Sequence, residues 1–480
     1  MIHWMAQYGT VLLTLFLSAL SLFAAGHAIL WKRDVRSAIG WAALIILSPG
    51  VGSLLYFLLG LNRVRRKAVT LRTPRERLPY GLALFAVDQQ NLDAVFDLKH
   101  EGLMQIARAV TSISTRPLLK GNKVEVLVNG EQAYPAMLEA IRQAERSITL
   151  QTYIFDSDSL GHMFIDELVA AHERGVEVRV LIDAVGVRYS YPHVNTILRA
   201  RGVKASLFIP FRNIAIFNLR SHRKIMVVDG HIGFTGGMNF RMSHLVQAPT
   251  KFPTSDLHFR LEGPVVSQLQ EVFVEDWHFT TKESLSGADW FRAVEAKGAV
   301  LARAIADGPD EHSHAMSLTF QAAIASAKRR IRIVTPYFLP DLTMCTALGV
   351  AAARGIEVDI IIPAQGNLKM VQWASWAQLW QIVDYGCRVW LSAPPFDHTK
   401  LMTVDGIWAA FGSTNWDARS LRLNFEFNIE AYDDALVQNL DNLIDERLAR
   451  ARRLSLEELL TRPLPLRLRD SLVRLMAPYL

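Results

Sequence analysis

The chain has 480 residues, of which half are hydrophobic and 20% are charged, and its formal net charge is +6. This balance is apolar for a soluble protein and too polar for a multi-span transporter, so it predicts a globular body with a small membrane part. The positive charge favours an anionic partner, either lipid or nucleic acid. The two cysteines, Cys345 and Cys387, form no Cys-x-x-Cys pattern. A disulfide framework is therefore not expected, and a reducing compartment is indicated for the body.

Two charge-free stretches stand near the beginning of the chain, at Tyr8–Leu30 and Ser37–Asn62. Each exceeds the ~20 residues that a helix needs to cross ~30 Å of hydrocarbon. The link between them, Lys32–Arg36, is too short for anything but a tight turn. The first apolar run is too long for a cleaved signal peptide and has no charged segment before it. We therefore predict a two-helix transmembrane hairpin in residues 1–67.

Basic residues beside the two stretches predict how this hairpin is inserted. The short loop at 32–36 carries three of them, whereas the segment 63–67 carries four. Positive charge is retained on the cytoplasmic side of a membrane. The pattern therefore predicts a multi-pass protein whose body is cytoplasmic and whose short loop faces outward.

An α/β rhythm follows a segment at 68–120 that has a mixed pattern and is predicted to be a linker. The first strands are rich in β-branched residues, and Gly175 marks the end of a helix. The predicted elements are strands at Val124–Val128 and Ile148–Phe155, a helix at Leu160–His172 and a buried parallel strand at Val176–Ile182.

The same order of elements returns later in the chain. The run Ala353–Val358 matches Glu173–Val178, and Gly175 and Gly355 are 180 positions apart. This period is too long for a solenoid. It predicts two copies of one α/β domain that pack about a pseudo-two-fold axis. The predicted domains are 121–290 and 291–445, followed by a basic amphipathic tail at 446–480.

One polar signature occurs once in each predicted domain. The two copies are His222, Lys224, Asp229 and Asn239, and His398, Lys400, Asp405 and Asn415. A His and a Lys two positions apart on a strand point to the same face, so one ligand can meet both. A glycine-rich turn before each Asn lets backbone donors approach an anion. Two histidines, two lysines and two asparagines that meet at one site suit a phosphate.

This set predicts displacement at phosphorus in two steps. One neutral histidine attacks and forms a phosphohistidine, and the other acts as acid and then as base. The lysines, the asparagines and the Ser413 hydroxyl would bind the phosphoryl oxygens. Asp256 and Glu426 lie at matching points after the two motifs and are candidates to orient the imidazoles. Asp229 and Asp405 either belong to the catalytic set or bond nearby backbone.

The doubled motif resembles the signature of the phospholipase D superfamily, and the resemblance covers roughly residues 120–440. Further segments are similar to bacterial cardiolipin synthases: Trp41, Pro49, Gly52 and Tyr56 in the hairpin, Gln151–Phe155, Thr335–Phe338 and Arg419–Glu426. The resemblance implies transfer of a phosphatidyl group from one phosphatidylglycerol to another, with release of glycerol. It implies neither metal nor other cofactor, and a place in the bacterial inner membrane. It also makes His222 the nucleophile and His398 the acid and base.

Several alternatives stay open. The first motif has Gly237-Met238 where the second has Ser413-Thr414, and no acidic residue follows Asn239 closely. Acceptor choice is therefore undecided among phosphatidylglycerol, phosphatidylethanolamine and other alcohols, and water would make the protein a hydrolase. A membrane-tethered nuclease and a non-catalytic scaffold are less favoured. Anionic phospholipids and a membrane are the expected partners, nucleic acid is not, and the oligomeric state is not predicted.

Three smaller features have two interpretations each. The helix that can be drawn over Asp470–Leu480 lies either on an anionic membrane or against the body. Trp373, Trp376 and Trp380 are either core residues or the lining of an acyl-chain entrance. His244 and His258 are interpreted as ordinary polar positions, although His258 follows Asp256 closely.

Overall fold

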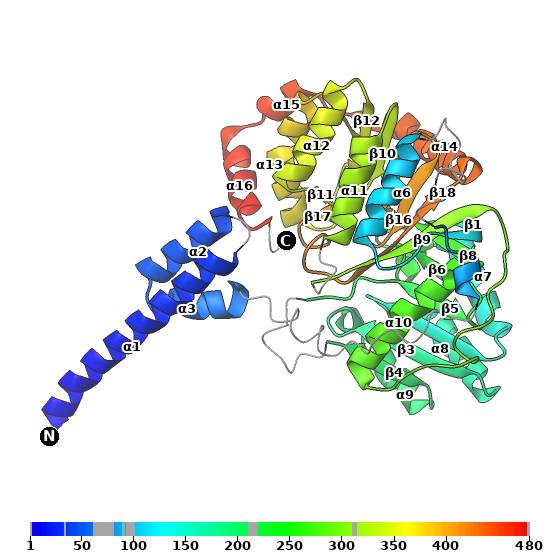
Figure 1. Ribbon diagram of the computed structural model, residues 1–480, viewed down its shortest axis with the longest axis horizontal. Coiled ribbons are helices and arrows are strands. Elements are labelled where there is room, and N and C mark those ends of the chain that lie inside the picture. The colour runs from blue at the N-terminus through cyan, green and yellow to red at the C-terminus, as the bar shows by residue number, and fades with distance from the viewer. Residues whose placement is uncertain are drawn as a thin grey trace. The chain divides into compact units, whose positions relative to one another are not determined.

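The computed structural model describes residues 2–32, 35–60, 81–88, 92, 101–209, 219–309 and 314–477. These residues form two units, an N-terminal helical unit and an α/β body, each of which is described by itself (Figure 1). The basic segment 63–67, which predicted the membrane orientation, lies outside the described residues.

The N-terminal unit contains one long apolar helix and two shorter ones. Its elements are α1 (Ile2–Trp31), α2 (Val35–Leu47), α3 (Val51–Leu55) and a π-helical turn, η1 (Tyr56–Gly60). Helix α1 packs against α2, and a small cluster that includes Ala28, Ile45 and Tyr56 is buried between them. The chain breaks between α2 and α3 at Gly50, which has a φ of 84°.

The predicted second span is therefore not one continuous helix. Among the described residues, only the stretch Tyr8–Trp31 is long and apolar enough to cross a membrane as a single helix. Pro49 precedes Gly50 at the break, and proline lacks the N–H that an unbroken helix would use.

One mixed sheet runs through the body. In its described part, fifteen strands join in the order β19-β13-β12-β10-β15-β16-β18-β9-β1-β8-β6-β5-β2-β3-β4. The first half supplies β1 (Leu119–Val128), β2 (Ser147–Thr152), β3 (Glu177–Asp183), β4 (Lys204–Phe208), β5 (Ile225–Val228), β6 (Ile232–Gly236) and β8 (Leu257–Glu262). The second supplies β9 (Val300–Asp307), β10 (Arg330–Val334), β12 (Glu357–Pro363), β13 (Arg388–Ser392), β15 (Leu401–Val404), β16 (Trp408–Gly412) and β18 (Glu426–Tyr432), and β19 (Arg452–Arg453) joins its edge.

The two halves of the sheet are built alike. Outward from β1 the order is β8, β6, β5, β2, β3 and β4, and outward from β9 it is β18, β16, β15, β10, β12 and β13. In both halves the last two pairings are parallel and the others are antiparallel. The repeat inferred from the sequence is therefore confirmed as a repeated α/β fold.

The helices repeat in the same way. The first half contains α7 (Asn129–Arg142), α8 (Ser159–Glu173), α9 (Val194–Ala200) and α10 (Val265–Thr281), and the second contains α11 (Ala315–Ser326), α12 (Leu342–Ala353), α13 (Lys369–Asp384) and α14 (Asp434–Arg450). Helix α8 follows the prediction closely, because Asp158 caps its first turn by accepting from the Gly161 N–H and Gly175, at a φ of 92°, follows its last turn.

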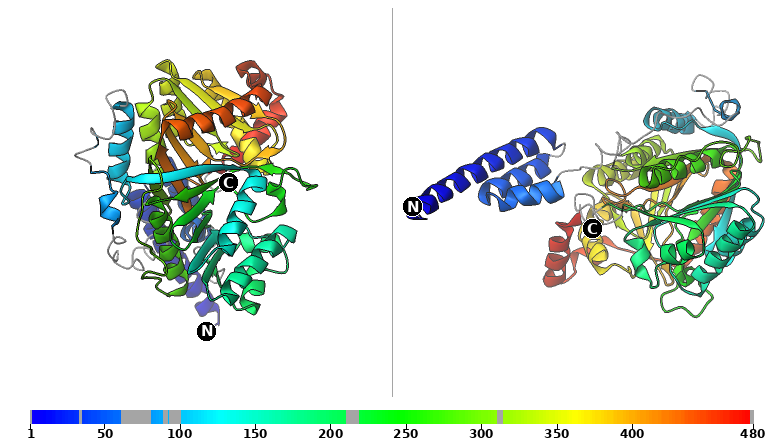
Figure 2. Two further views of the ribbon diagram at one scale, coloured as in Figure 1. Left: turned by 90° about the vertical axis from the view of Figure 1, so that its right-hand side faces the viewer. Right: turned by 90° about the horizontal axis from the view of Figure 1, so that it is seen from below.

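Segments outside the repeat pack on its second half. Helix α6 (Glu101–Ile113), which lies within the predicted linker, packs beside α11 (Figure 1, Figure 2). The tail forms α15 (Leu456–Leu460) and α16 (Leu464–Arg474), and both contact α13. The region before the first domain is thus partly folded onto the second half.

A shared hydrophobic cluster joins the two halves. Phe259 of β8 and Phe411 of β16 stack with their ring centroids 3.7 Å apart. Apolar residues of α10 and α14 belong to the same cluster. Burial of this apolar surface holds the halves together, so the motif of one half can contact the other.

Candidate active site

Short backbone pairings fix each motif histidine against the opposite half. Ser221 forms a bridge with Phe425, and the His222 N–H donates to the Phe425 carbonyl at 2.8 Å. In the same way β14 (Phe396–Asp397) pairs with β7 (Thr254–Ser255), and the His398 N–H donates to the Ser255 carbonyl at 2.7 Å. The backbone of each motif histidine is therefore bonded to the residue that precedes a carboxylate of the other half, Glu426 or Asp256.

The imidazoles and carboxylates pair crosswise between the halves. His222 Nδ1 lies 3.1 Å from Glu426 Oε2 and 3.0 Å from the Ser413 carbonyl oxygen. His398 Nδ1 lies 2.8 Å from Asp256 Oδ2. All of these partners are acceptors, so in the neutral rings Nδ1 carries the proton and Nε2 keeps its lone pair. The predicted candidates Asp256 and Glu426 thus hold the histidine of the opposite half.

Burial favours the neutral form of both imidazoles in the free protein. Desolvation and the neighbouring Lys224 lower the pKa of His222, although Glu426 acts in the opposite direction. The pKa of His398 is well below its ordinary value because of burial, Lys400, Lys224 and also His222. The influence of His222 on His398 indicates that the two motifs share one electrostatic environment.

Two buried lysines accompany the histidines. Lys224 Nζ donates to the His222 carbonyl at 2.6 Å, and Lys400 Nζ donates to the His398 carbonyl. Burial lowers the pKa of Lys224 to about 7 and that of Lys400 to about 8. An anion that enters the site would favour the charged form of both ammonium groups.

The two carboxylates differ in how they are stabilised. Burial alone would raise the pKa of Glu426, but His222, Lys224 and Ser413 hold it below the ordinary value. The Ser413 hydroxyl donates to Glu426 Oε2 at 2.5 Å and accepts from the Phe427 N–H. For Asp256, burial raises the pKa and Lys400 only partly offsets it. The Ser413 hydroxyl, which the sequence predicts to bind phosphate, donates its hydrogen to Glu426 in this structure.

The two asparagines are held by different atoms. Asn239 Oδ1 accepts from the Ile154 N–H at 3.1 Å, which leaves its amide hydrogens as the donors for a ligand. Asn415 Nδ2 donates to the Ser420 hydroxyl at 3.2 Å. Both side chains are buried next to the motif strands.

Asp229 and Asp405 support the backbone. The Asp229 carboxylate accepts from the N–H groups of Glu145, Arg146 and Ser147, and Asp405 accepts from those of Lys328, Arg329 and Arg330. These bonds fasten the end of each motif strand to the turn before the neighbouring strand. Of the two interpretations left open by the sequence, this geometry supports the structural one.

Comparison with known proteins identifies the family. The family model described as "Cardiolipin synthase, PLD-like domain" matches residues 137–277 and 320–448, and "Phospholipase_D-nuclease N-terminal" matches 19–60. Cardiolipin synthase A of Pseudomonas putida (strain GB-1) is 33% identical over 442 residues, which cover 92% of each chain. Cardiolipin synthase A of Pseudomonas aeruginosa (strain LESB58) is 33% identical over 447 residues, which cover 91% of this chain and 89% of that one. The chain belongs to the cardiolipin synthase family.

Membership of the cardiolipin synthase family makes the chain a phosphatidyltransferase of the phospholipase D type that is associated with a membrane, as the sequence predicted. The crystal structure of a phosphatidylserine synthase of Haemophilus influenzae Rd KW20 has the same fold. It superposes with a TM-score of 0.63 at 16% identity and covers 78% of this chain and all of that one.

Some residues at this cardiolipin synthase site were not singled out from the sequence. The centroid of the Tyr153 ring lies 5.4 Å from that of the His222 ring and 5.9 Å from Lys224 Nζ. His244, interpreted above as an ordinary polar position, is buried with its ring 6.1 Å from that of His398. Burial lowers the pKa of His244 to about 3. The position of Tyr153 in the family-like run Gln151–Phe155 was the available signal, whereas nothing in the sequence marked His244.

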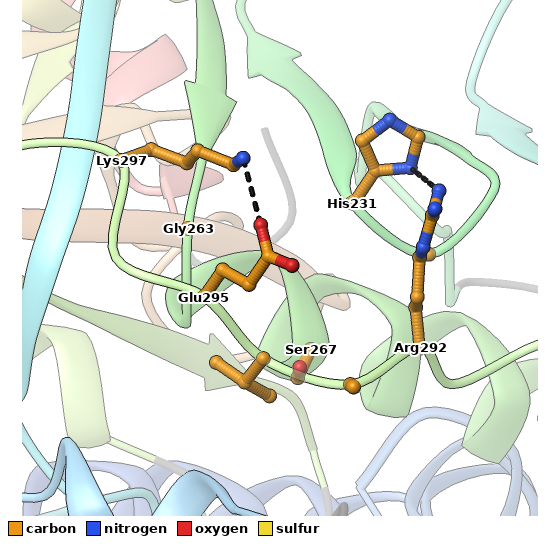
Figure 3. Close-up of a pocket in the computed structure, with 9 residues that line it drawn as sticks. His231, Gly263, Ser267, Arg292, Glu295 and Lys297 are labelled. Carbon is orange, nitrogen blue, oxygen red and sulfur yellow. Dashed lines mark hydrogen bonds and ion pairs between the residues drawn. The ribbon is translucent and has the colours of Figure 1, made fainter.

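A small pocket lies beyond the far end of strand β5. It is lined by Gly230, His231, Gly263, Ser267, Arg292, Ala293, Val294, Glu295 and Lys297 (Figure 3). Its charged groups are engaged with one another, since Lys297 pairs with Glu295 at 2.9 Å and Arg292 contacts His231. Lys224 precedes β5 and Gly230 follows it, so this pocket is separate from the histidine site. Among the described residues, no group of three or more His, Cys, Asp and Glu side chains is arranged to hold a metal ion.

Proposed function

We propose that the chain joins two phosphatidylglycerol molecules into cardiolipin and releases glycerol through a phosphohistidine. The observation that carries this proposal is the crossed pairing of His222 with Glu426 and of His398 with Asp256 beside two buried lysines. The family relationship over 92% of the chain supports the lipid substrate.

In the first step, Nε2 of His222 attacks the phosphorus of one phosphatidylglycerol. The new N–P bond forms as the bond from phosphorus to the headgroup glycerol oxygen breaks, and His398 gives that oxygen a proton. The anionic substrate, placed beside His398, would raise the low pKa of this imidazole, which would then take up a proton from solvent before the step. Lys224, Lys400 and the Asn239 amide would stabilise the charge on the phosphoryl oxygens.

In the second step, His398 acts as the base. It removes a proton from a headgroup hydroxyl of the second phosphatidylglycerol, whose oxygen then attacks phosphorus. The N–P bond breaks, and the neutral His222 is restored with its Nδ1 proton still held by Glu426. Each proton taken in one step is returned in the other, so the reaction needs no further reactant.

We further propose how the chain is organised around this reaction. Residues 1–67 would form a transmembrane hairpin in the cell inner membrane, with α2 and α3 together as the broken second span and the body in the cytoplasm. Residues 121–290 and 291–445 would be tandem domains about a pseudo-two-fold axis, which the matching strand order supports. Residues 68–120 would join the hairpin to the body, and 446–480 would form the basic tail.

Product analysis tests the proposal. Full-length protein in mixed micelles of phosphatidylglycerol and detergent, assayed in heavy-oxygen water, should release one glycerol for each cardiolipin. Phosphatidic acid that carries the heavy oxygen, as the sole product, would make the protein a hydrolase and refute the transferase. Addition of phosphatidylethanolamine or a simple alcohol would identify a different acceptor if the mixed product replaced cardiolipin.

A further inference from the structure

Helix α16 in the tail exposes its apolar face. Leu464, Leu468, Leu472 and Leu475 recur at intervals of four, four and three residues along the helix and its last turn, so they lie on one side. Their exposed fractions are 65%, 55%, 65% and 77%. Single exposed leucines are common on protein surfaces, but an aligned row of four marks an interaction surface.

Polar contacts hold the opposite side of α16 against the body. Asp470 is fully buried and pairs with Arg462 at 2.6 Å and with Arg469 at 2.7 Å. The same two arginines stack on α13, Arg462 over Trp376 at 4.7 Å and Arg469 over Trp373 at 4.1 Å. These contacts fix the rotation of α16 with its leucines outward, the reverse of an ordinary surface helix.

The segment that contains this leucine face has an excess of positive charge. Residues 450–477 contain seven arginines and three acidic residues. Arg467 is exposed on α16 itself and Arg453 is exposed before α15, whereas Arg452 pairs with Glu458. An apolar stripe with arginines at its border is complementary to a surface that combines hydrocarbon with negative headgroups.

A chain of contacts links the helix beneath α16 to the candidate active site. Helix α13, on which α16 packs, begins two residues after Asn367. Asn367 Oδ1 accepts from the Tyr337 hydroxyl at 2.8 Å, and Phe396 lies between Tyr337 and His398, with ring centroids 6.5 Å and 6.1 Å away. Leu368 and Met370 are exposed at this start of α13. These contacts connect the start of α13, the helix on which α16 packs, to His398.

We propose that the leucine face of α16 docks the body onto an anionic phospholipid bilayer and so brings the histidine site to the surface that contains the lipid substrate. The four leucines enter the boundary between headgroups and acyl chains, and the arginines meet the headgroups. This interaction is separate from the apolar N-terminal helix and acts on the body itself.

The test compares a double variant with a matched control in the full-length protein. Leu468→Glu/Leu472→Glu places two carboxylates in the docking face, and Met163→Glu/Leu318→Glu places two at exposed positions on α8 and α11. In vesicles of phosphatidylglycerol and phosphatidylcholine, we expect the first variant to lose at least about tenfold activity and the control to stay within about twofold of the parent. On short-chain phosphatidylglycerol dissolved as monomers, all three proteins should be equally active.

The two assays separate this proposal from the proposed function. Inactivity of the parent protein in both assays would count against the transferase and not against docking. Equal activity of all three proteins in vesicles would overturn the docking proposal. So would a loss that is equally large on monomers, because it would report damage to the fold.

A lipid-quenching measurement reports docking directly. Cys345 and Cys387 are buried, so a fluorophore on Leu468→Cys labels one site in the folded protein. In proteoliposomes that contain brominated lipid, this fluorophore should be quenched, whereas the same label on Met163→Cys should not. An unquenched label at 468, together with a mass by light scattering that falls in the Leu468→Glu/Leu472→Glu variant, would assign the face to a second copy of the chain and overturn the proposal.

Discussion

The two halves of the candidate site reach the same geometry with different side chains. In one pair, His222 is held by the long Glu426, which takes a hydrogen bond from Ser413. In the other, His398 is held by the shorter Asp256, and Gly237 stands where the first pair has Ser413. A Cβ built on Gly237 would lie 2.3 Å from Asp256 Oδ1, so the carboxylate occupies the space that a serine would need.

This difference shifts the pKa values of the two carboxylates in opposite directions. Glu426 has a lowered pKa and Asp256 a raised one, each with the causes described above. A firmly ionised partner suits a histidine that stays in one tautomer and attacks phosphorus. A carboxylate with a raised pKa attracts the imidazole proton less strongly, which suits a histidine that gains and loses a proton. The comparison therefore agrees with His222 as the nucleophile and His398 as the acid and base.

Removal of each imidazole gives the largest effect and tests this division directly. We expect His222→Ala and His398→Ala each to lower kcat by about 10⁴-fold or more, since catalytic groups that act together are lost together. With phosphatidylglycerol labelled in its phosphate and an acid-free denaturing quench, His398→Ala should retain label on the protein and His222→Ala should not. Label on His398 in the His222→Ala protein would exchange the two roles.

Neutral amides in place of the carboxylates should give the next largest effect. Asp256→Asn removes the acceptor of His398 Nδ1, and its amide N–H would favour the wrong tautomer, so we expect a loss in kcat of about 10³–10⁴-fold. Glu426→Gln should cost less, about 10²-fold, because the Ser413 carbonyl still accepts from His222 Nδ1. Unchanged thermal midpoints would show that both proteins fold. A larger loss for Glu426→Gln would contradict the role of the backbone acceptor.

The Gly237 and Ser413 positions allow a smaller and more selective test. Gly237→Ala pushes its Cβ against Asp256 and should lower kcat by about 10²-fold with little change in KM. Ser413→Ala removes one hydrogen bond to a charged group and should cost about tenfold. Gly366→Ala is the matched control, because its Cβ would meet side-chain atoms only at 3.4 Å or more. Equal losses of kcat in Gly237→Ala and Ser413→Ala would show that these two positions do not distinguish the halves.

The buried lysines predict that kcat/KM depends on pH in the neutral to basic range. With the pKa of Lys224 at about 7 and that of Lys400 at about 8, the ammonium forms that bind phosphate are present below these values. The ratio kcat/KM reports the free enzyme, so it should fall as pH rises from about 7 to 9. An arginine keeps its charge at every pH tested, so in Lys224→Arg the decrease of kcat/KM should begin at a higher pH. A flat profile up to pH 9 would show that these lysines stay charged.

Local signals in the sequence predicted the repeated elements and the motif residues. The cap and stop of α8 lie within a few residues of the helix they limit, and the strands of both halves show their burial in their β-branched composition. The sequence signal for the break after α2 was weaker, because a Pro-Gly pair can either kink a helix or end it. The second apolar stretch therefore looked longer than any single helix within it.

The crossed pairing could not be predicted in the same way. His398 and Asp256 are separated by 142 positions and His222 and Glu426 by 204, so only the packing of the two halves brings them together. The contact of Ser413 with Glu426 had no sequence signal either, because a hydroxyl beside the motif suits a phosphate oxygen and a carboxylate equally well. His244 was overlooked for a similar reason, since its proximity to His398 depends on the fold and on no spacing.

Asp229 and Asp405 offer the smallest effect on chemistry and a last contrast between the halves. Both have positive φ, 51° and 55°, a conformation that asparagine tolerates, so Asn substitutions change the charge without straining the backbone. Asp229 is buried and Asp405 is half-buried. Loss of a carboxylate that accepts three backbone N–H bonds should lower the free energy of unfolding by about 1–3 kcal/mol in Asp229→Asn and by less in Asp405→Asn.

Activity per folded molecule separates support from catalysis at these two positions. Thermal unfolding in detergent would measure the stability change, and kcat measured well below both midpoints should stay within about twofold of the parent. A hundredfold loss of kcat in a protein that remains folded would return these aspartates to the chemistry. The expected result would instead divide each motif into a histidine and lysine that face the lipid and an aspartate that fastens their strand to its neighbour.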